Sequence, residues 1–423
     1  MNRKLWIIAG ISLASAYQHI QPAPFGLFEP YDINIRLRKP GRHHWSLGVL
    51  GEKSYNVKGY ATDDAEDDTF LVNPLQIYEA SQNSLAMYQT VQAENSSMVQ
   101  LLNSITAGSG GGASNTGNGL FIPTGTFCVG QVAVNAIFGL SRDFFVGAYL
   151  PMYGARLHQV HWDYRGDNTL FSGQDIEQLV ANFQYDMKHL FGLNIGGWKQ
   201  VGLGDLTILF EWQKDFHQLR PVLKCVQPNV RIGFSLPTSA KTNTHNIMAP
   251  SFGNDGSISI PFGGGLNLNL AQHIDFGFAS QFWYIFSNQN CRRIKTFDTQ
   301  TSLLFPTVTE VIKQYAFIQN FDLYAQANFF NKRLALKFCY QYWRKGDDTI
   351  TPISADFNHE IANSARPLAE RTQHDVFLAL TYSPCAQDFK RVFPQAQLFW
   401  KGAVKGTRAA LASTAGAQFS LIF

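Results

Sequence analysis

The residue types that most often do chemistry gather at His158, His161 and Asp163. Imidazole and carboxylate groups bind divalent metals, but a metal site needs several ligands that converge on one point. In an extended strand His158 and His161 point to opposite faces, and the adjacent pair His43 and His44 also faces apart. The sequence therefore predicts no metal and no other cofactor.

Nucleophilic catalysis is the second chemistry to consider, because some membrane barrels are hydrolases. It needs a serine or an acid with a histidine base within hydrogen-bond reach. No predicted strand places such a set on one face in neighbouring positions. The glycine-rich stretch at residues 108–119 lacks the lysine and hydroxyl residue of a phosphate-binding loop, so it predicts a linker. We expect no enzyme activity, with a barrel hydrolase as an alternative.

Charged and amide side chains alternate with apolar ones at a period of two along much of the chain. Such alternation predicts strands with one polar and one apolar face. The side chains expected to line a lumen are Asp205, Glu211, Gln227, Asn229, Arg231, Asp275, Gln281, Asp322, Lys337 and Lys401. They form either the wall of a narrow pore or pairs that fill and brace the barrel, because buried charges are paired.

Twelve alternating segments begin near residues 44, 125, 143, 201, 221, 257, 274, 314, 333, 371, 392 and 411. A tilted strand needs about 9 to 11 residues to cross the hydrocarbon of a membrane. An even strand number places both ends of the barrel on one side. The sequence thus predicts an all-β fold, a transmembrane antiparallel up-and-down barrel at residues 44–423 with about 12 strands. Residues 31–38 also alternate, which leaves 14 strands as an alternative.

The end of the chain carries a membrane-barrel signature. Phe419, Leu421 and Phe423 share one face of the last predicted strand, opposite Gln418 and Ser420. An apolar outer face that ends in an aromatic residue resembles the C-terminal strand by which bacterial outer-membrane barrels are recognised and inserted. We therefore interpret Phe419, Leu421 and Phe423 as an assembly signal, and we expect the barrel-assembly machinery and outer-membrane lipid as partners.

The start of the chain predicts export. Arg3 and Lys4 precede an apolar run at residues 5–13, and small residues follow at 14–16. This is the pattern of a cleaved signal peptide, predicted at residues 1–16. Residues 17–43 are then a periplasmic segment or an extra strand. The expected location is the bacterial outer membrane.

The links between predicted strands are of two kinds. Short turns near residues 141–143, 215–220, 271–273, 330–332 and 384–391 alternate with long links near 59–124, 157–200, 237–256, 288–313 and 346–371. Outer-membrane barrels have short periplasmic turns and longer extracellular loops, so we expect the long links outside. Apolar residues at helical spacing predict a helical insertion within 59–124, as an outer loop or a plug, and a second helix at 174–189.

Three short motifs suggest a family. They are FVGAYLP at residues 145–151, GLGDLT at 202–207 and GFSLPT at 233–238. This arrangement, within residues 138–238, resembles the outer-membrane transporter family named for the MetA pathway of phenol degradation, which is akin in architecture to long-chain fatty-acid transporters. The resemblance implies a monomeric barrel that passes small, often hydrophobic molecules. The chain differs from the fatty-acid transporters in lacking an obvious N-terminal hatch, although Asn73 and Pro74 match the asparagine-proline pair of that hatch.

Composition and strand number complete the functional interpretation. The formal net charge of +3 gives no case for nucleic-acid binding, and the five cysteines have neither disulfide-framework nor metal-site spacing. A barrel of about 12 strands lies between the filled interior of eight strands and the aqueous channel of 16 to 18. We expect an outer-membrane channel or transporter for passive passage of small solutes. The alternative is a structural or adhesive barrel without an open pore.

Overall fold

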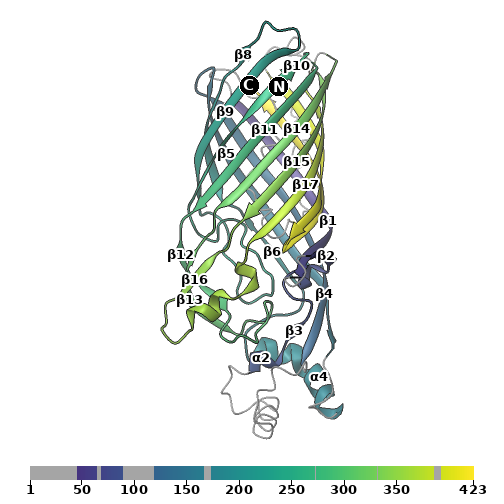
Figure 1. The fold of residues 1–423 in the computed structure, drawn as a ribbon, viewed down its shortest axis with the longest axis vertical. Helices are drawn as coiled ribbons and strands as arrows, with labels where there is room; N and C mark the ends of the chain where they lie inside the picture. Colours follow the sequence, from purple (N-terminus) through teal and green to yellow (C-terminus); the bar gives the residue numbers. More distant parts are fainter. Residues whose placement is uncertain are drawn as a thin grey trace, which may run out of the picture.

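The computed structural model describes residues 45–63, 68–88, 119–165, 173–271, 273–330, 332–384 and 392–423. These residues form a closed barrel of 12 antiparallel strands, which confirms the predicted fold and strand number (Figure 1). The barrel strands are β1 (Trp45–Asp63), β4 (Leu120–Gly139), β5 (Phe144–Tyr164), β7 (Leu206–Gln213), β9 (Leu223–Leu236), β10 (Ser259–Leu270), β11 (Ile274–Ile285), β14 (Ile318–Phe329), β15 (Leu334–Lys345), β17 (Arg371–Tyr382), β18 (Phe393–Thr407) and β19 (Ala409–Ile422).

The barrel closes at its first strand. β1 pairs with β19, from Ser46 opposite Ile422 onward, and with β4, from Trp45 opposite Phe138 onward. The backbone N–H of Phe423 donates to the carbonyl of Trp45 at 2.8 Å. Closure is required because an unpaired backbone group in hydrocarbon costs several kcal/mol.

The two faces of each strand differ as the alternation predicts. On β11, Phe276 and Phe278 are exposed on the outside, whereas Gly277 and Ala279, which alternate with them, are buried. An apolar outer face on a closed barrel is the architecture of bacterial outer-membrane proteins. Within the described residues, no helix is both long and apolar enough to cross a membrane.

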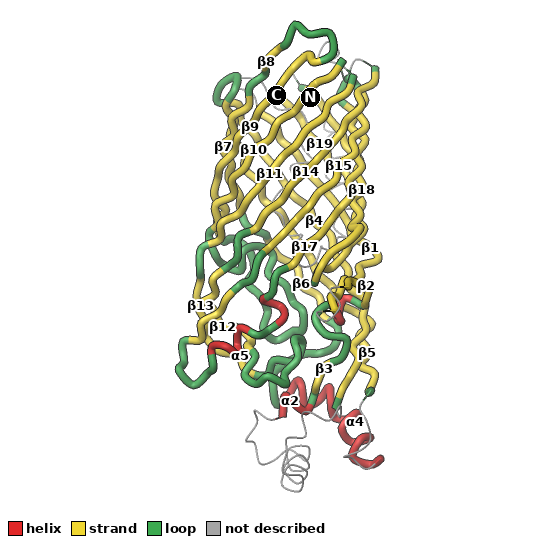
Figure 2. The backbone as a smooth tube through the Cα atoms, viewed as in Figure 1, coloured by secondary structure: helices red, strands yellow, loops and turns green. Residues whose placement is uncertain are grey.

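Short turns and long links lie at opposite ends of the barrel. The C-terminus and the short turns occupy one end, together with β8 (Phe216–His217), which pairs with β9 (Figure 1). The described parts of the long links cover the other end, and we call them the outer dome (Figure 2). β4 and β5 extend past their neighbours into this dome, so β4 begins at Leu120 rather than near residue 125.

The outer dome has its own secondary structure. A three-stranded sheet is formed by β12 (Asn288–Ile294), β13 (Thr307–Gln314) and β16 (Thr349–Pro352). Short elements β2 (Asp68–Val72), β3 (Gln82–Asn83) and β6 (Trp198–Leu203) extend the barrel wall. The helices are η2 (Pro74–Gln76), α2 (Leu85–Tyr88), α4 (Gly173–His189), α5 (His359–Asn363) and η4 (Arg366–Leu368), and α4 confirms the helix predicted at residues 174–189.

An apolar cluster holds the dome on the barrel wall. Phe183 of α4 stacks on Phe121 of β4 with ring centroids 4.2 Å apart, and both are buried with Leu75 and Leu85. The Asn73 side chain bonds to both the N–H and the carbonyl of Gly125, so the described part of the first link docks on β4. Residues 89–118 lie outside the described residues and leave the choice between loop and plug open. The predicted signal peptide and residues 17–43 lie outside them as well.

Replacing Phe278 by Arg tests the lipid-facing register. We expect the free energy of unfolding in bilayers to fall by about 2 to 4 kcal/mol, because a charge on the lipid face near the midplane is not solvated. Phe330→Arg in the short turn after β14 is the matched control, since Phe330 is 76% exposed there. Equal destabilisation of the two variants, measured as denaturant midpoints, would show that Phe278 does not meet lipid.

Deleting Phe423 tests the predicted assembly signal. Phe419 and Phe423 are both exposed on the outer face of the closing strand, so the ring is available to another protein before closure. We expect less folded protein in the outer membrane and more degradation in the periplasm, measured by fractionation and heat-shifted gels. Normal surface amounts of the truncated chain would exclude Phe423 from the signal.

Candidate functional site

A cavity of about 400 Å³ lies between the outer dome and the mouth of the barrel. Its walls include the dome residues Tyr78, Leu303 and Phe305. Its floor includes Trp283 of β11 and Trp343 of β15, both buried on the inner faces of their strands. The cavity therefore joins the dome to the inside of the barrel wall.

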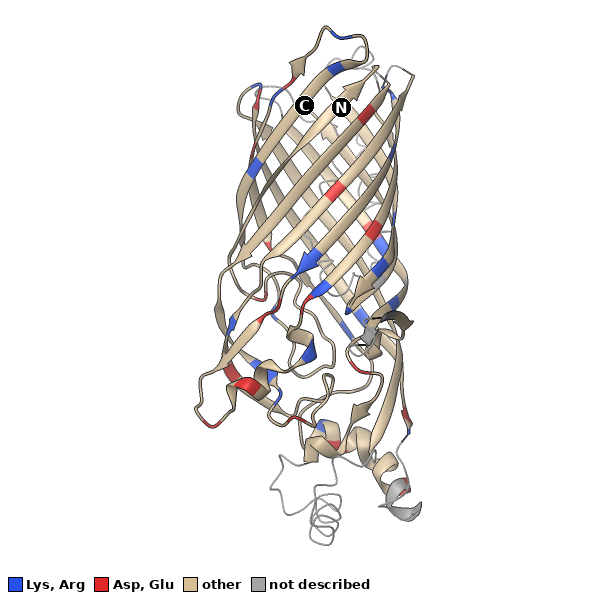
Figure 3. Ribbon diagram, in the orientation of Figure 1, with Lys and Arg blue, Asp and Glu red and all other residues tan. Residues whose placement is uncertain are grey.

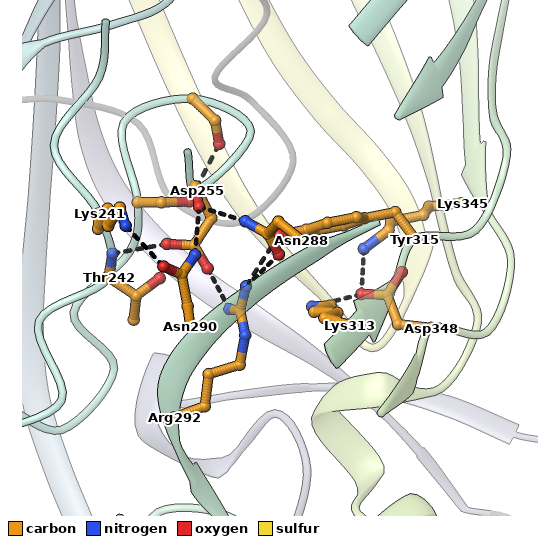
Figure 4. Close-up of polar contacts among 12 residues, drawn as sticks. Lys241, Thr242, Asp255, Asn288, Asn290, Arg292, Lys313, Tyr315, Lys345 and Asp348 are labelled. Atoms are coloured by element: carbon orange, nitrogen blue, oxygen red, sulfur yellow. Dashed lines mark hydrogen bonds and ion pairs between the residues drawn. The ribbon is translucent and has the colours of Figure 1, made fainter. Parts of the chain in front are cut away.

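One wall of the cavity is organised by Asp255. Its carboxylate accepts a hydrogen bond from the backbone N–H of Thr242 at 2.8 Å and forms an ion pair with Arg292 (Figure 4). Arg292 also donates to the hydroxyl of Tyr315 at 2.9 Å and to the side-chain oxygen of Asn288 at 3.0 Å. Burial raises the pKa of Tyr315 to about 12 despite the nearby Arg292, so this hydroxyl stays a hydrogen-bonding group at neutral pH.

A second ionic cluster joins the dome sheet to the barrel. The carboxylate of Asp348 lies 2.7 Å from the ammonium of Lys313 on β13 and 2.5 Å from that of Lys345 at the end of β15 (Figure 4). Burial works to raise the pKa of Asp348, but the two ammonium groups outweigh it and hold this pKa well below its usual range. The stabilisation from this pKa shift is complete above the ordinary carboxyl pKa of about 4, and it is lost only as the pH falls through the folded value.

Arg293 ties three dome segments together. Its guanidinium donates to the backbone carbonyls of Thr244, Phe191, Gly192, Phe305 and Pro306 over 2.5 to 3.0 Å. Burial lowers its pKa to about 10, which leaves it cationic at neutral pH. Arg293 thus fixes the shape of the cavity wall and also contributes a positive charge to it.

Cations outnumber anions around the cavity. Within the part of the chain that the structure describes, six basic residues line it, but only one acidic residue, Asp255, does. Asp348, which does not line the cavity, forms ion pairs with Lys313 and Lys345. Among the described residues, neither Lys295 nor Arg371 forms an ion pair, and the Nε of Arg371 is buried without a hydrogen-bond partner. The basic residues are Arg292, Arg293, Lys295, Lys313, Lys345 and Arg371. A basic excess beside Trp283, Trp343 and Leu303 suits a solute with an apolar body and a negative group.

Below the cavity, the inner face of the barrel is polar and buried. Gln281 and Asp322, predicted to line the lumen, are each 1% exposed. Lys401 lies 3.5 Å from the carboxylate of Asp375, and the ammonium of Lys337 sits 4.2 Å from the ring centre of Tyr324. These charges are neutralised or packed by neighbours on the same inner face.

Glu211 and Arg231, also predicted to line the lumen, have neighbours of opposite charge or polar character. Glu211 and Arg231 face each other across β7 and β9, and both are buried. Arg231 also donates to Asn229 at 3.0 Å.

Nearer the short turns, amide side chains donate hydrogen bonds to carboxylates of the barrel. Gln227 bonds to Asp215, and Asp275 accepts hydrogen bonds of 2.6 Å from both Asn269 and Asn328.

Asp205, also predicted to line the lumen, is buried near the dome end of the barrel, next to β6 (Figure 1). It lies in the break between β6 and β7, where its carboxylate accepts hydrogen bonds from the backbone N–H groups of Ser239 at 3.1 Å and Asn254 at 2.6 Å. Thr238 donates to the carbonyl of Gly204 at 2.7 Å, so the GLGDLT and GFSLPT motifs contact each other here. This contact anchors the link between β9 and β10 to the wall.

An apolar layer interrupts the polar inner face of the barrel, where the sequence predicted only a polar lining. It consists of the buried residues Leu50, Ala133, Cys339, Phe377, Ala379 and Phe399, with Tyr324 packed against them, and we call it the constriction layer. The rings of Phe377 and Phe399 stack at 5.7 Å, and Phe377 and Cys339 are each 0% exposed. Side chains of five strands therefore pack together on the inner face at this level.

His158, considered above as a metal ligand, takes part in another contact. The Nε2 of His158 lies 3.5 Å from the thiol of Cys128. Among the hydrogen bonds of the described residues, no histidine pairs with a serine.

Sequence reasoning missed the cavity residues, although one signal was present. The run from Arg292 to Lys295 places three bases in four positions within the predicted long link near 288–313. Its partners Asp255 and Tyr315 come from other segments of the chain, so only the folded dome brings them together.

Comparison with known proteins gives distant structural likenesses. No family model matches the chain, and no curated protein matches it by sequence. An outer-membrane channel from Pseudomonas putida F1 has a TM-score of 0.47 at 8% identity, over 95% of this chain and 100% of that one. The toluene transporter TbuX from Ralstonia pickettii has a TM-score of 0.32 at 8% identity, over 90% and 89% of the two chains. A FadL homologue from Pseudomonas aeruginosa has a TM-score of 0.31 at 11% identity, over 94% of each chain.

Asp348→Asn tests the junction of dome and barrel. The change removes the carboxylate that pairs with the buried Lys313 and Lys345, and breaking a buried ion pair from one side costs about 3 to 5 kcal/mol. We expect faster hydrogen exchange and proteolysis in residues 346–371, with the barrel intact. Asp356→Asn on the exposed part of the same link is the control. The junction would be unimportant if both variants exchanged like the parent protein.

Proposed function

We propose that the protein is an outer-membrane channel for passive passage of small solutes that carry an apolar body and a negative group. The cavity carries this proposal, because its floor is made by inward-facing residues of the barrel itself. A solute that enters it through the dome meets aromatic rings and unpaired basic groups before it reaches the lumen. Arg371 and Lys295 would hold the negative group, and Trp283 and Trp343 the apolar body.

The constriction layer then governs passage. Its stacked rings of Phe377 and Phe399 belong to neighbouring strands, and movement of either side chain would open a path of limited width. Polar residues on both sides of the layer would accept a solute that passes. The predicted lining residues, including Arg231, Gln281 and Asp322, remain proposals for contacts along this path.

A structural or adhesive barrel without an open pore is the second candidate. The burial of the constriction layer favours it, because Phe377 and Cys339 have no exposed surface. The dome, which covers the mouth of the barrel, would then be the functional surface. The two candidates differ in whether removing the rings of the layer creates conduction.

The double variant Phe377→Ala and Phe399→Ala, recorded as single channels in planar bilayers, separates them. For a channel, we expect the conductance to rise several-fold, since two large rings leave the narrowest level. Leu378→Ala, next to Phe377 but exposed on the lipid face, should leave conductance unchanged. Variants that fold, by heat-shifted mobility, yet conduct no better than the parent would favour the structural barrel.

A further inference from the structure

Three exposed bases lie side by side on the outer face of the barrel wall, at its dome end. Arg156 of β5 is directly opposite Lys199 of β6, and Cys128 of β4 is opposite Arg156 on the other side. Lys53 of β1 is paired with Gly130, two residues along β4 from Cys128, and it is close enough to act electrostatically on the Cys128 thiol, as Arg156 also does. We call Lys53, Arg156 and Lys199 the basic rim.

The basic rim begins where the lipid-facing surface ends. On β1, Trp45, Leu47 and Val49 are exposed and lie on the same face as Lys53. On β6, Val201 is 69% exposed and lies on the same face as Lys199. The distance along the barrel axis from Trp45 to Lys53 is roughly 20 Å at ordinary strand rise and tilt, close to the height of an apolar band of about 25 Å.

Aromatic residues mark the same boundary. Tyr55 of β1 is exposed next to Lys53, and its hydroxyl accepts a hydrogen bond from the indole of Trp400 at 3.0 Å. Tyr and Trp with a polar tip gather at membrane–water interfaces. The basic rim therefore lies at the level of lipid head groups, while the apolar part of the wall contacts acyl chains.

The arrangement of charge at the basic rim is unfavourable without an anion. Like charges directly opposite on paired strands destabilise a sheet, and their Cβ atoms are about 4.5 to 5.5 Å apart. Among the described residues, Lys53, Arg156 and Lys199 form no ion pair. Elsewhere on the barrel, the exposed Arg344 is paired with Glu370 at 2.7 Å. Figure 3 shows that basic residues recur where the barrel meets the dome.

We propose that Lys53, Arg156 and Lys199 bind the phosphate groups of an anionic lipid in the leaflet on the dome side. A phosphate between the facing Arg156 and Lys199 would remove their repulsion and accept charge-assisted hydrogen bonds from both. Lys53 would reach the same head group or its second phosphate. The acyl chains would lie on the apolar face below, so the site would contact both the head group and the acyl chains of one lipid.

Lipid titration of the purified full chain tests this site. The protein is placed in phosphatidylcholine nanodiscs, lipid A is added, and the midpoint of heat-shifted mobility reports binding. We expect lipid A to raise the midpoint of the parent protein. In the triple variant with Lys53→Gln, Arg156→Gln and Lys199→Gln, the affinity for lipid A should fall about fivefold for each charge removed, roughly a hundredfold in all. The variant should fold in phosphatidylcholine alone, because it loses like-charge repulsion.

Matched controls give the results that would overturn the proposal. Arg142→Gln, Lys224→Gln, Lys332→Gln removes three bases near the short turns, and its response to lipid A should stay within about twofold of the parent. An equal loss in the two triple variants would indicate general charge attraction, and an unchanged response in the basic-rim variant would exclude the site. Lipid A without phosphates should have no effect. If inorganic phosphate alone stabilised the parent as well as lipid A does, the site would bind a free anion rather than lipid.

Discussion

Backbone hydrogen bonding in hydrocarbon is the constraint on which the rest of this structure depends. A sheet inside a bilayer has no water for its edges, so β1 must pair with both β4 and β19. Closure fixes one face of every strand toward lipid and the other toward a lumen. Because the strands run up and down, successive links alternate between the two ends, and the described parts of the long links meet at one end, against each other and the barrel mouth (Figure 2). The dome, its cavity and the basic rim are consequences of this geometry.

The narrow lumen then decides how the inner face is composed. A closed barrel of this strand number leaves little room for water, so inward charges must have neighbours that neutralise or pack them. The carboxylate of Asp375 neutralises Lys401, and the ring of Tyr324 packs against the ammonium of Lys337. In the constriction layer, Phe377 and Phe399 fill space that polar side chains would leave underpacked. The cavity is wide only because the dome residues, rather than the strands, form most of its wall.

Much of the barrel could be predicted from sequence because the alternation of apolar and polar residues within each strand indicates which face meets lipid. Phe276 and Phe278 on the outside of β11 are recognisable from neighbouring residues alone. The dome could not be predicted in this way. Arg293 bonds to carbonyls from three links, and Asp348 joins β13 to β15, so their roles depend on contacts between distant segments. Phe377 on an otherwise polar face shows that alternation identifies the inner face without revealing whether that face is packed.

Cys339 provides the most direct measurement of the central claim, that the constriction layer closes the lumen to water. This thiol is not in a disulfide and is 0% exposed within the layer. In a variant with serine at Cys128, Cys225, Cys291 and Cys385, reaction of Cys339 with a charged, membrane-impermeant maleimide should be negligible in the refolded barrel. Adding Phe377→Ala should make Cys339 react readily. Rapid labelling of Cys339 with Phe377 in place would show an open aqueous path at this level and contradict the account.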